Sequence, residues 1–104
     1  MYGARFAIYT EDPGMIPGIM EALGGSLERA GCGSVSSHSW IIASCGSVLV
    51  KVRVELGMGA PMEPVRAPAV KVEALSSEPE GVRWVGELLG GALKGVNAAL
   101  VLEG

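Results

Sequence analysis

The sequence predicts an α+β domain, a two-layer structure in which two helices cover one face of an antiparallel sheet. The clearest signal lies in residues 34–56, where apolar residues occupy every second position: Val48, Val50, Val52, Val54 and Leu56. Such alternation of β-branched with polar residues is typical of a strand with one buried face. Two other segments, after Ile16 and after Pro79, repeat apolar residues at helical spacing. The expected order of elements is β-α-β-β-(β)-α.

Length and composition limit the organisation of the chain and its partners. With 104 residues it is expected to form one domain spanning residues 1–104. Hydrophobic residues make up 49% and charged residues 18%, which favours a globular chain over a disordered one. The net charge of -3 argues against strong unaided binding of nucleic acid. Glutamine is absent and Asn97 is the one asparagine, and this scarcity of amides fits a thermophile.

The chain shows no targeting or membrane signal. Residues 1–5 lead directly into an expected strand, so no signal peptide is predicted. Charged residues interrupt the most hydrophobic region, residues 82–102, before it reaches the roughly 18 residues of a membrane span. A cytoplasmic protein without membrane contact is therefore expected. Cys32 and Cys45 are too few for a disulfide scaffold.

The first strand is predicted over residues 5–10, with Phe6 and Ile8 on one face. Asp12 begins an Asp-Pro-Gly turn, and its carboxylate is placed to cap the following helix. The helix is expected to begin near Ile16 and to end before Gly31, a plausible residue for the left-handed conformation that follows a helix. Its buried stripe comprises Ile16, Ile19, Met20, Leu23 and Leu27.

A hairpin should follow, with strands over residues 38–44 and 48–56. Its two-residue turn is either Gly46-Ser47 or Cys45-Gly46. Both registers place Ile41 and Ala43 on the buried face and leave an apolar group on the opposite face: Trp40, Ile42 and Leu49. That group is too apolar to leave in water, so a second copy of the sheet is the natural cover, and a homodimer is predicted.

The second half of the chain repeats the pattern of strand and helix. Residues 57–68 are rich in glycine and proline and are expected to be a loop, followed by a fourth, edge strand over residues 69–75. A second helix should begin near Pro79, which suits a first turn. Its apolar stripe comprises Val82, Val85, Leu89, Ala92, Val96 and Leu100.

Glycines interrupt this second helix at positions 86, 90, 91 and 95. Each costs about 1 kcal/mol relative to alanine in a helix interior. Either another backbone passes close to the helix, or the helix ends at Gly90 or Gly95 and a strand follows. In the first interpretation the glycine side of the helix receives a larger protein partner. The predicted partner-binding residues are Arg83, Gly86, Glu87, Gly90, Gly91 and Lys94.

Few residues are candidates for chemistry. His38 is the single histidine, and its neighbour Ser39 points to the other side of the strand, so a nucleophile–base pair is not expected. The spacing of His38, Cys32 and Cys45 matches no zinc pattern. The sequence therefore predicts no enzyme, metal or cofactor. Trp40 beside Lys51 or Arg53 could stack on a nucleic-acid base, but a dimer interface is favoured.

Three segments carry a resemblance to a known family: IMEALGGSLE (19–28), SSHSWIIASCGSVLVKVRVE (36–55) and LKGVNAALVLE (93–103). Together they resemble the small dimerising subunit of the KEOPS complex. The resemblance implies a non-catalytic scaffold in a complex that makes threonylcarbamoyl-adenosine in tRNA. Such a subunit dimerises through its sheet and holds the catalytic subunit through its helices. Residues 57–77 depart from the family as an insertion and basic residues are sparser here, so tRNA contact is expected only indirectly or within a complex.

A second resemblance involves YTEDPGMIPGIMEAL (9–23), which looks like the start of an ACT domain, a regulatory module that binds amino acids. This resemblance implies a ligand site at Asp12 and Gly14, where the carboxylate and the helix N-terminus would hold the amine and carboxylate of the ligand. The two resemblances differ over residues 96–102. A helix there favours the KEOPS-like interpretation, and a strand favours the ACT-like one.

Overall fold

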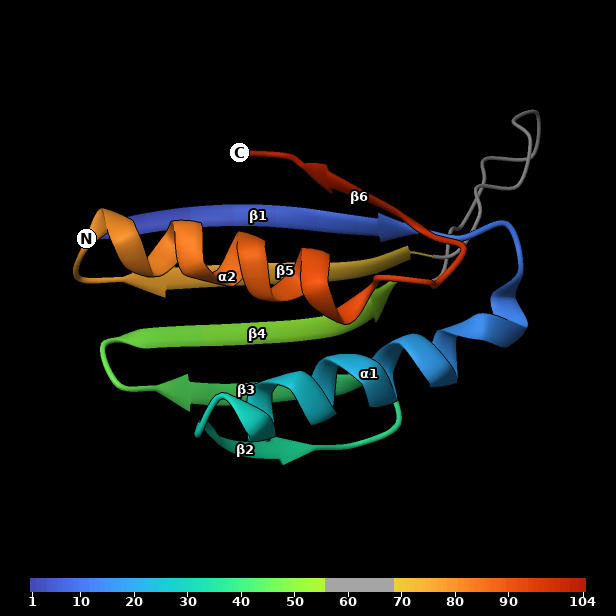
Figure 1. Ribbon diagram of the computed structural model, residues 1–104, viewed down its shortest axis with the longest axis horizontal. Coiled ribbons are helices and arrows are strands. Elements are labelled where there is room, and N and C mark those ends of the chain that lie inside the picture. Colours follow the sequence, from blue (N-terminus) through green and yellow to red (C-terminus); the bar gives the residue numbers. More distant parts are fainter. Residues whose placement is uncertain (56–68) are drawn as a thin grey trace.

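The computed structural model describes residues 1–55 and 69–104, and residues 56–68, with the whole of the expected loop, lie outside the described residues. Six strands form one antiparallel sheet in the order β2-β3-β4-β5-β1-β6 (Figure 1). The strands are β1 (Tyr2–Tyr9), β2 (Gly33–Ser36), β3 (Trp40–Cys45), β4 (Val48–Glu55), β5 (Ala69–Ser76) and β6 (Ala99–Leu102). The helices are the short 3-10 helix η1 (Pro13–Met15), α1 (Ile16–Arg29) and α2 (Pro79–Ala92). The predicted α+β class is confirmed.

The β3–β4 hairpin has the predicted register. Cys45 pairs with Val48, so the two-residue turn is Gly46-Ser47, and Gly46 has the positive φ of 68° that glycine tolerates. Ile41 and Ala43 lie on the buried face with Val50. The alternation of apolar and polar residues therefore determines which face of this hairpin is covered.

The prediction is wrong in omitting β2 and in placing β5 at an edge, and of the two alternatives left open for the end of the chain the structure has the closing strand. Residues 33–36 form an additional strand, β2, and β3 begins only at Trp40. β5 was expected at an edge, but it lies between β4 and β1. The chain closes with β6, which pairs with β1, so the second helix does not continue to Leu100. The actual order is β-α-β-β-β-β-α-β.

The first helix follows its sequence signals closely. The Asp12 carboxylate accepts a hydrogen bond from Gly14 N at 2.9 Å and caps η1, after which α1 begins at Ile16. Gly31 has a φ of +85°, the left-handed conformation expected after the helix. All five residues of the predicted stripe are buried: Ile16, Ile19, Met20, Leu23 and Leu27.

The second helix ends directly after the glycine pair Gly90-Gly91. α2 ends at Ala92, and Gly95 has a φ of +82° in the connection to β6. The interpretation in which the helix ends early and a strand follows is therefore the correct one. At the other end of α2 the packing is tight, because a Cβ on Gly81 would collide with the side chains of Ser76 and Val48. This glycine brings the first turn of α2 close to the sheet.

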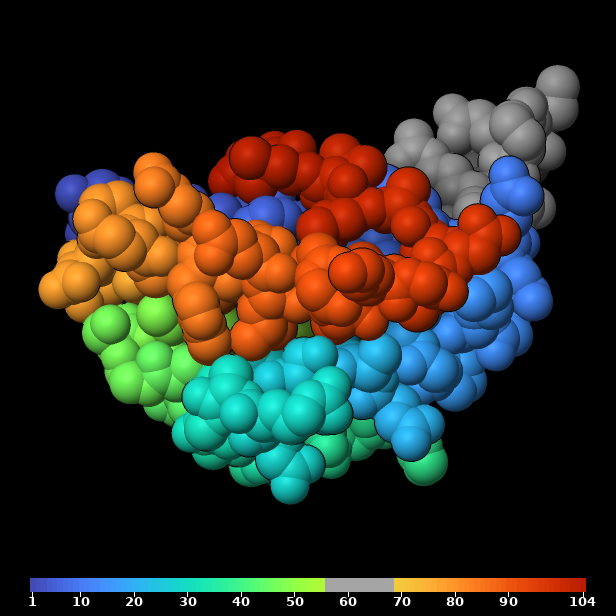
Figure 2. Space-filling model, in the orientation of Figure 1, coloured from blue at the N-terminus to red at the C-terminus, as the bar shows by residue number. Residues whose placement is uncertain are grey.

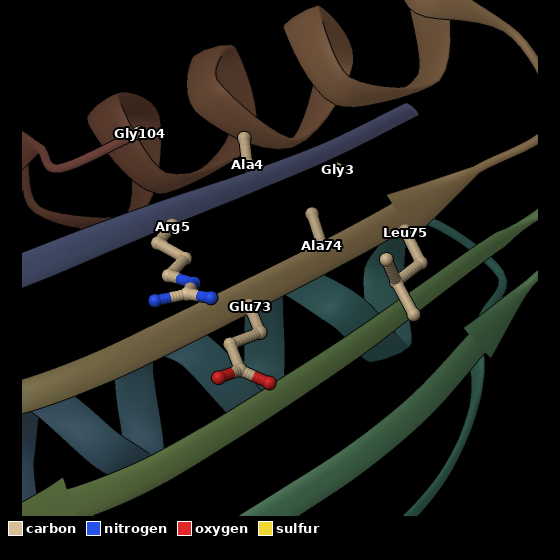
Figure 3. A pocket seen from close by; sticks show the side chains of 7 residues that line it. All are labelled: Gly3, Ala4, Arg5, Glu73, Ala74, Leu75 and Gly104. Carbon is tan, nitrogen blue, oxygen red and sulfur yellow. The ribbon is translucent and has the colours of Figure 1, made fainter. Parts of the chain in front are cut away.

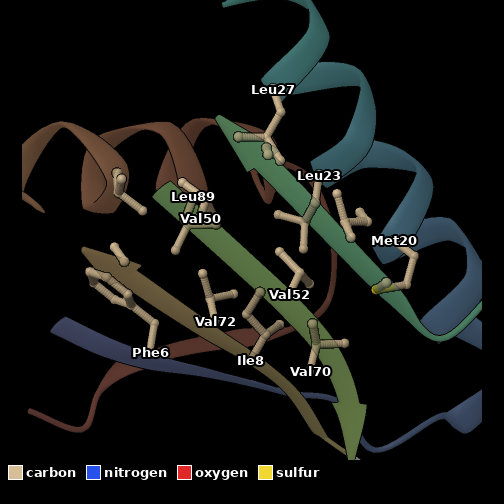
Figure 4. Packing of buried hydrophobic residues seen from close by; sticks show 14 of the residues in the cluster. Phe6, Ile8, Met20, Leu23, Leu27, Val50, Val52, Val70, Val72 and Leu89 are labelled. Atoms are coloured by element: carbon tan, nitrogen blue, oxygen red, sulfur yellow. The ribbon is translucent and has the colours of Figure 1, made fainter. Parts of the chain in front are cut away.

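Both helices lie on the same side of the sheet, where they enclose the core (Figures 1 and 4). α1 contacts β2 and β3, whereas α2 contacts β1, β4 and β5. The two helices run side by side over the sheet in Figure 2. The core between these layers includes Phe6, Ile8, Leu23, Leu27, Val50, Val52, Val70, Val72, Val85 and Leu89.

The topology is that of a split βαβ unit with an added hairpin strand pair. Taken alone, β6-β1-β5-β4 with α1 and α2 has the strand order 4-1-3-2 of the β-α-β-β-α-β motif. β2 and β3 are inserted after α1 and extend the sheet beyond β4. Within the described residues, no helix is long and apolar enough to cross a membrane.

Candidate functional site

The sheet face opposite the helices is the candidate functional surface, and it is called the open face below. No helix among the described residues lies on it (Figure 1). The pairing register shows which outward residues are neighbours across the strands. One row runs through Ile42, Lys51, Glu73 and Arg5. The next rows contain Trp40, Arg53, Lys71 and Ala7 on one side, and Ser44, Leu49, Leu75 and Gly3 on the other.

The residues predicted for a dimer interface lie together on this face. Trp40 and Ile42 project from β3 with 38% and 46% of their surface exposed, and Leu49 is half-buried on the neighbouring β4. The structure adds Leu75, which pairs with Leu49, and Val35, which pairs with Ile42. Both are exposed, at 39% and 66%. Sequence analysis missed them because β5 was expected at an edge and β2 was not expected.

Charges of both signs surround this apolar group. The cations are Arg5, Lys51, Arg53 and Lys71, and the acids are Glu55, Glu73 and Glu103. Arg53 lies 3.4 Å from Glu55, and Lys71 lies 2.9 Å from Glu103. The second pair is a charge-assisted hydrogen bond, which lowers the pKa of the Glu103 carboxyl and raises the pKa of the Lys71 amine.

A shallow depression of about 290 Å³ lies between β1 and β5 at Gly3 (Figure 3). Figure 3 shows Arg5, Glu73 and Leu75 projecting to the open face, whereas Ala4 and Ala74 point the other way. Because Gly3 has no side chain, Leu75 extends over it, and a Cβ there would lie 3.3 Å from Leu75 Cδ2. The depression is therefore a shallow hollow in a nearly flat face, and such a face is suited to contact with another surface.

The predicted partner-binding residues of α2 do not all lie on the same side of the helix. Gly86 faces the sheet, since a Cβ there would lie 3.5 Å from the Phe6 ring. A Cβ on Gly90 or Gly91 would meet nothing within 4 Å among the described residues. Arg83, Glu87, Gly90 and Gly91 are exposed at spacings that form one stripe along the outside of α2, and exposed Lys94 follows just after the end of the helix. No backbone of this chain among the described residues packs on that stripe, and a Cβ on Gly86 would meet the Phe6 side chain rather than a backbone, so the explanation of a close backbone is not supported at these glycines.

The alternative ligand residues, Asp12 and Gly14, bond to each other. Asp12 is exposed, and its Oδ1 is the acceptor for Gly14 N. Beside them lies a depression of about 410 Å³ between the end of β1 and the connection from α2 to β6, lined by Tyr9, Thr10, Glu11, Asn97, Ala98 and Ala99. Asp12 and Gly14 do not line it. The polar groups nearest to a ligand-sized space are therefore Thr10, Glu11 and Asn97.

His38 lies in the turn between β2 and β3, where it is exposed. It borders a depression of about 350 Å³ between this turn and α1, together with Ser36, Ser37 and Glu21. Among the described residues no group of three His, Cys, Asp or Glu could hold a metal.

Cys32 and Cys45 form a disulfide, which sequence analysis did not predict. The bond joins the residue just before β2 to the last residue of β3 and closes the β2–β3 hairpin at its base. The register explains it, because Gly33 pairs with Ser44 and the next pair outward is Cys32 with Cys45. The signal was in the sequence, but it becomes visible only once β2 is recognised.

No family model matches the chain, and no curated protein is similar to it in sequence.

Proposed function

We propose that this protein is a non-catalytic scaffold that works as a homodimer and associates through its open face. One observation carries the proposal: the helices cover one face of the sheet, whereas the other exposes Trp40, Ile42 and Leu75 beside charges of both signs. Clustered apolar residues rimmed by polar ones mark association surfaces in soluble proteins. A self-complementary face of this kind suits a two-fold dimer.

A scaffold needs a second surface for its larger partner, and the exposed stripe of α2 is the proposed one. Gly90 and Gly91 leave the backbone bare between Glu87 and Lys94, so another helix could approach closely there. The KEOPS-like role in tRNA modification would use such a surface. The closing strand β6 counts against that particular role, since the resemblance requires a helix there. We therefore propose the scaffold role without assigning the complex that it serves.

The dimer is tested by sedimentation velocity of the parent and of Trp40→Glu at micromolar concentration. A carboxylate on the open face cannot be desolvated cheaply, so Trp40→Glu should sediment as a monomer, whereas the parent sediments as a dimer. Leu102→Glu is the matched control, because Leu102 is an exposed apolar residue opposite Phe6 on the helix side of β6. A monomeric parent would rule out the proposal, and so would a dimer that tolerates Trp40→Glu but not Leu102→Glu.

A second candidate function, an ACT-like amino-acid-binding module, is favoured by one observation: residues 99–102 form the closing strand that it requires. In this case the depression beside Thr10, Glu11 and Asn97 would hold the ligand. Titration calorimetry with the twenty amino acids tests it. Binding that is lost in Asn97→Ala would support the candidate, and no heat from any amino acid at millimolar concentration would contradict it.

A further inference from the structure

On the open face, charged and apolar residues of β4 and β5 pair in a definite order along the boundary between these two strands, which is called the β4–β5 seam below. Across this seam Leu49 pairs with Leu75, Lys51 with Glu73 and Arg53 with Lys71. The outward pairs are thus apolar with apolar, cation with acid, and cation with cation. Neighbouring strands lie about 4.8 Å apart, so these side chains form a compact strip at the centre of the face.

We propose that two copies of the chain meet about a two-fold axis that runs along the strands, above the β4–β5 seam. This inference rests on the proposed homodimer and specifies its geometry. Rotation about such an axis exchanges the two strands, so each β4 residue faces, in the second copy, the residue that it neighbours in its own chain. Lys51 of each copy then faces Glu73 of the other, and Leu49 faces Leu75.

The remaining central pair, Arg53 facing Lys71, joins like charges, but each already has an acid of its own chain. Arg53 lies 3.4 Å from Glu55, and Lys71 lies 2.9 Å from Glu103. These acids compensate the two cations before the copies meet. Among the described residues, neither Lys51 nor Glu73 has an ion-pair partner within 4.0 Å, so these two charges are not compensated within that part of the chain.

Two other axes along the strands fit the charges less well, and a third, above the β5–β1 seam, pairs Glu73 with Arg5 but leaves β3, with Trp40 and Ile42, opposite no strand of the second copy. An axis above β5 places Glu73 against Glu73 and Lys51 against Arg5, because these two cations flank Glu73 in one row. An axis between β3 and β4 places the Lys51 amine against Ile42. Like charges brought together cost several kcal/mol at an interface, and a buried unpaired amine is also unfavourable. The β4–β5 seam, at the middle of the six-strand order, brings together only Arg53 and Lys71 as like charges, and each of these has an acid of its own chain within 3.4 Å.

Single-stranded RNA is the rival occupant, since Trp40 and Tyr9 could stack on bases beside Arg53 and Lys71. The acidic residues of the open face argue against RNA as the occupant. Glu55, Glu73 and Glu103 lie between the cations, and a phosphate backbone needs a continuous basic track. A second copy with the same alternation is the better electrostatic partner.

Mixing two variants tests the seam. Lys51→Glu and Glu73→Lys each place like charges across the proposed interface, so each alone should dimerise at least about tenfold more weakly than the parent. Mixed in equal amounts they should form a heterodimer of near-parental affinity, because every intermolecular contact between positions 51 and 73 is then between opposite charges. Within each chain the two positions still carry like charges, so the rescue can only come from contacts between chains.

The outcomes separate this inference from the proposed function. Analytical ultracentrifugation of the mixture, with one variant labelled by a fluorophore, measures the heterodimer. If Trp40→Glu breaks the dimer but Lys51→Glu does not, or the mixture stays monomeric, the seam is wrong and the dimer stands. If the parent is monomeric and binds a single-stranded uridine oligonucleotide at micromolar concentration, both are wrong. Glu28→Lys, at an exposed position on α1, is the control, and it should dimerise like the parent.

Discussion

Lys71 Nζ lies 2.9 Å from Glu103 Oε1 and 3.0 Å from Glu103 Oε2, so one ammonium group bridges both oxygens of the carboxylate. The pair fastens the residue after β6 to β5 across the intervening strand β1. The Lys71 amine also lies 5.5 Å above the Tyr9 ring, and the Tyr9 hydroxyl donates to Glu103 Oε2 at 3.4 Å. The short closing strand is thereby held by side chains as well as by its pairing with β1.

The Lys71–Glu103 pair predicts that Glu103→Gln destabilises the domain modestly. The amide removes the charge and leaves Lys71 with a weaker acceptor. A thermal melt at neutral pH and low salt should show a lower melting temperature than the parent. Glu87→Gln, at an exposed position on α2, is the control and should melt like the parent. An unchanged melting temperature for Glu103→Gln would show that β6 does not need this contact.

The same pair predicts how the difference between parent and Glu103→Gln depends on pH. The hydrogen bond lowers the pKa of Glu103, so its contribution is complete above the ordinary pKa of about 4.3 and is lost as the pH falls through the lowered value. The pKa of Lys71 is raised, so its contribution is complete below about 10.4 and is lost as the pH rises through the raised value. The difference in melting temperature should therefore be level near neutrality and vanish at both extremes. A difference that persists in strong acid would contradict this assignment.

Two glycines of α2 predict opposite effects of the same substitution. Gly90→Ala should raise the free energy of unfolding by about 1 kcal/mol, because the new Cβ meets nothing within 4 Å among the described residues and alanine is the better helix former. Gly81→Ala should lower it by about 1–3 kcal/mol, because its Cβ would collide with Ser76 and Val48. Urea unfolding of both variants against the parent measures the two changes. If both substitutions stabilise the domain, α2 does not pack as closely on the sheet as described.

Sequence alone predicted the parts of this fold that depend on local periodicity. The β3–β4 hairpin, its turn at Gly46 and the buried stripe of α1 follow from patterns within about ten residues. Each pattern sets which side is buried, and burial of one side determines the register. The same reasoning placed Trp40, Ile42 and Leu49 on one face, and their position together on the open face is confirmed.

The remaining features depend on contacts between distant segments. β2 is short and reads GSVS, which has too few apolar residues to show alternation. β6 could be read as a continuation of the apolar stripe of α2, and only its pairing with β1 makes it a strand. The interior position of β5 likewise arises because β1 pairs with it. Such pairings leave no local signal, so the sheet order and the residues Leu75 and Val35 of the open face were not predictable.

The Cys32–Cys45 disulfide makes a prediction about stability and the environment of the protein. The bond joins cysteines with a sequence separation of 13. Closing a loop of this length lowers the conformational entropy of the unfolded chain, which raises the free energy of unfolding by about 3 kcal/mol. Cys32→Ala/Cys45→Ala should therefore unfold at a lower urea concentration than the parent, and with a larger dependence on urea because its unfolded chain is more expanded. Reducing agent should lower the stability of the parent toward that of the double variant, and should leave the double variant unchanged. A parent that is insensitive to reducing agent, while both cysteines react with a thiol reagent under native conditions, would show that the bond does not form in solution.

Disulfides persist in oxidising compartments and within cells of hyperthermophiles. The bond therefore agrees with the predicted cytoplasmic location only if the predicted thermophilic origin also holds.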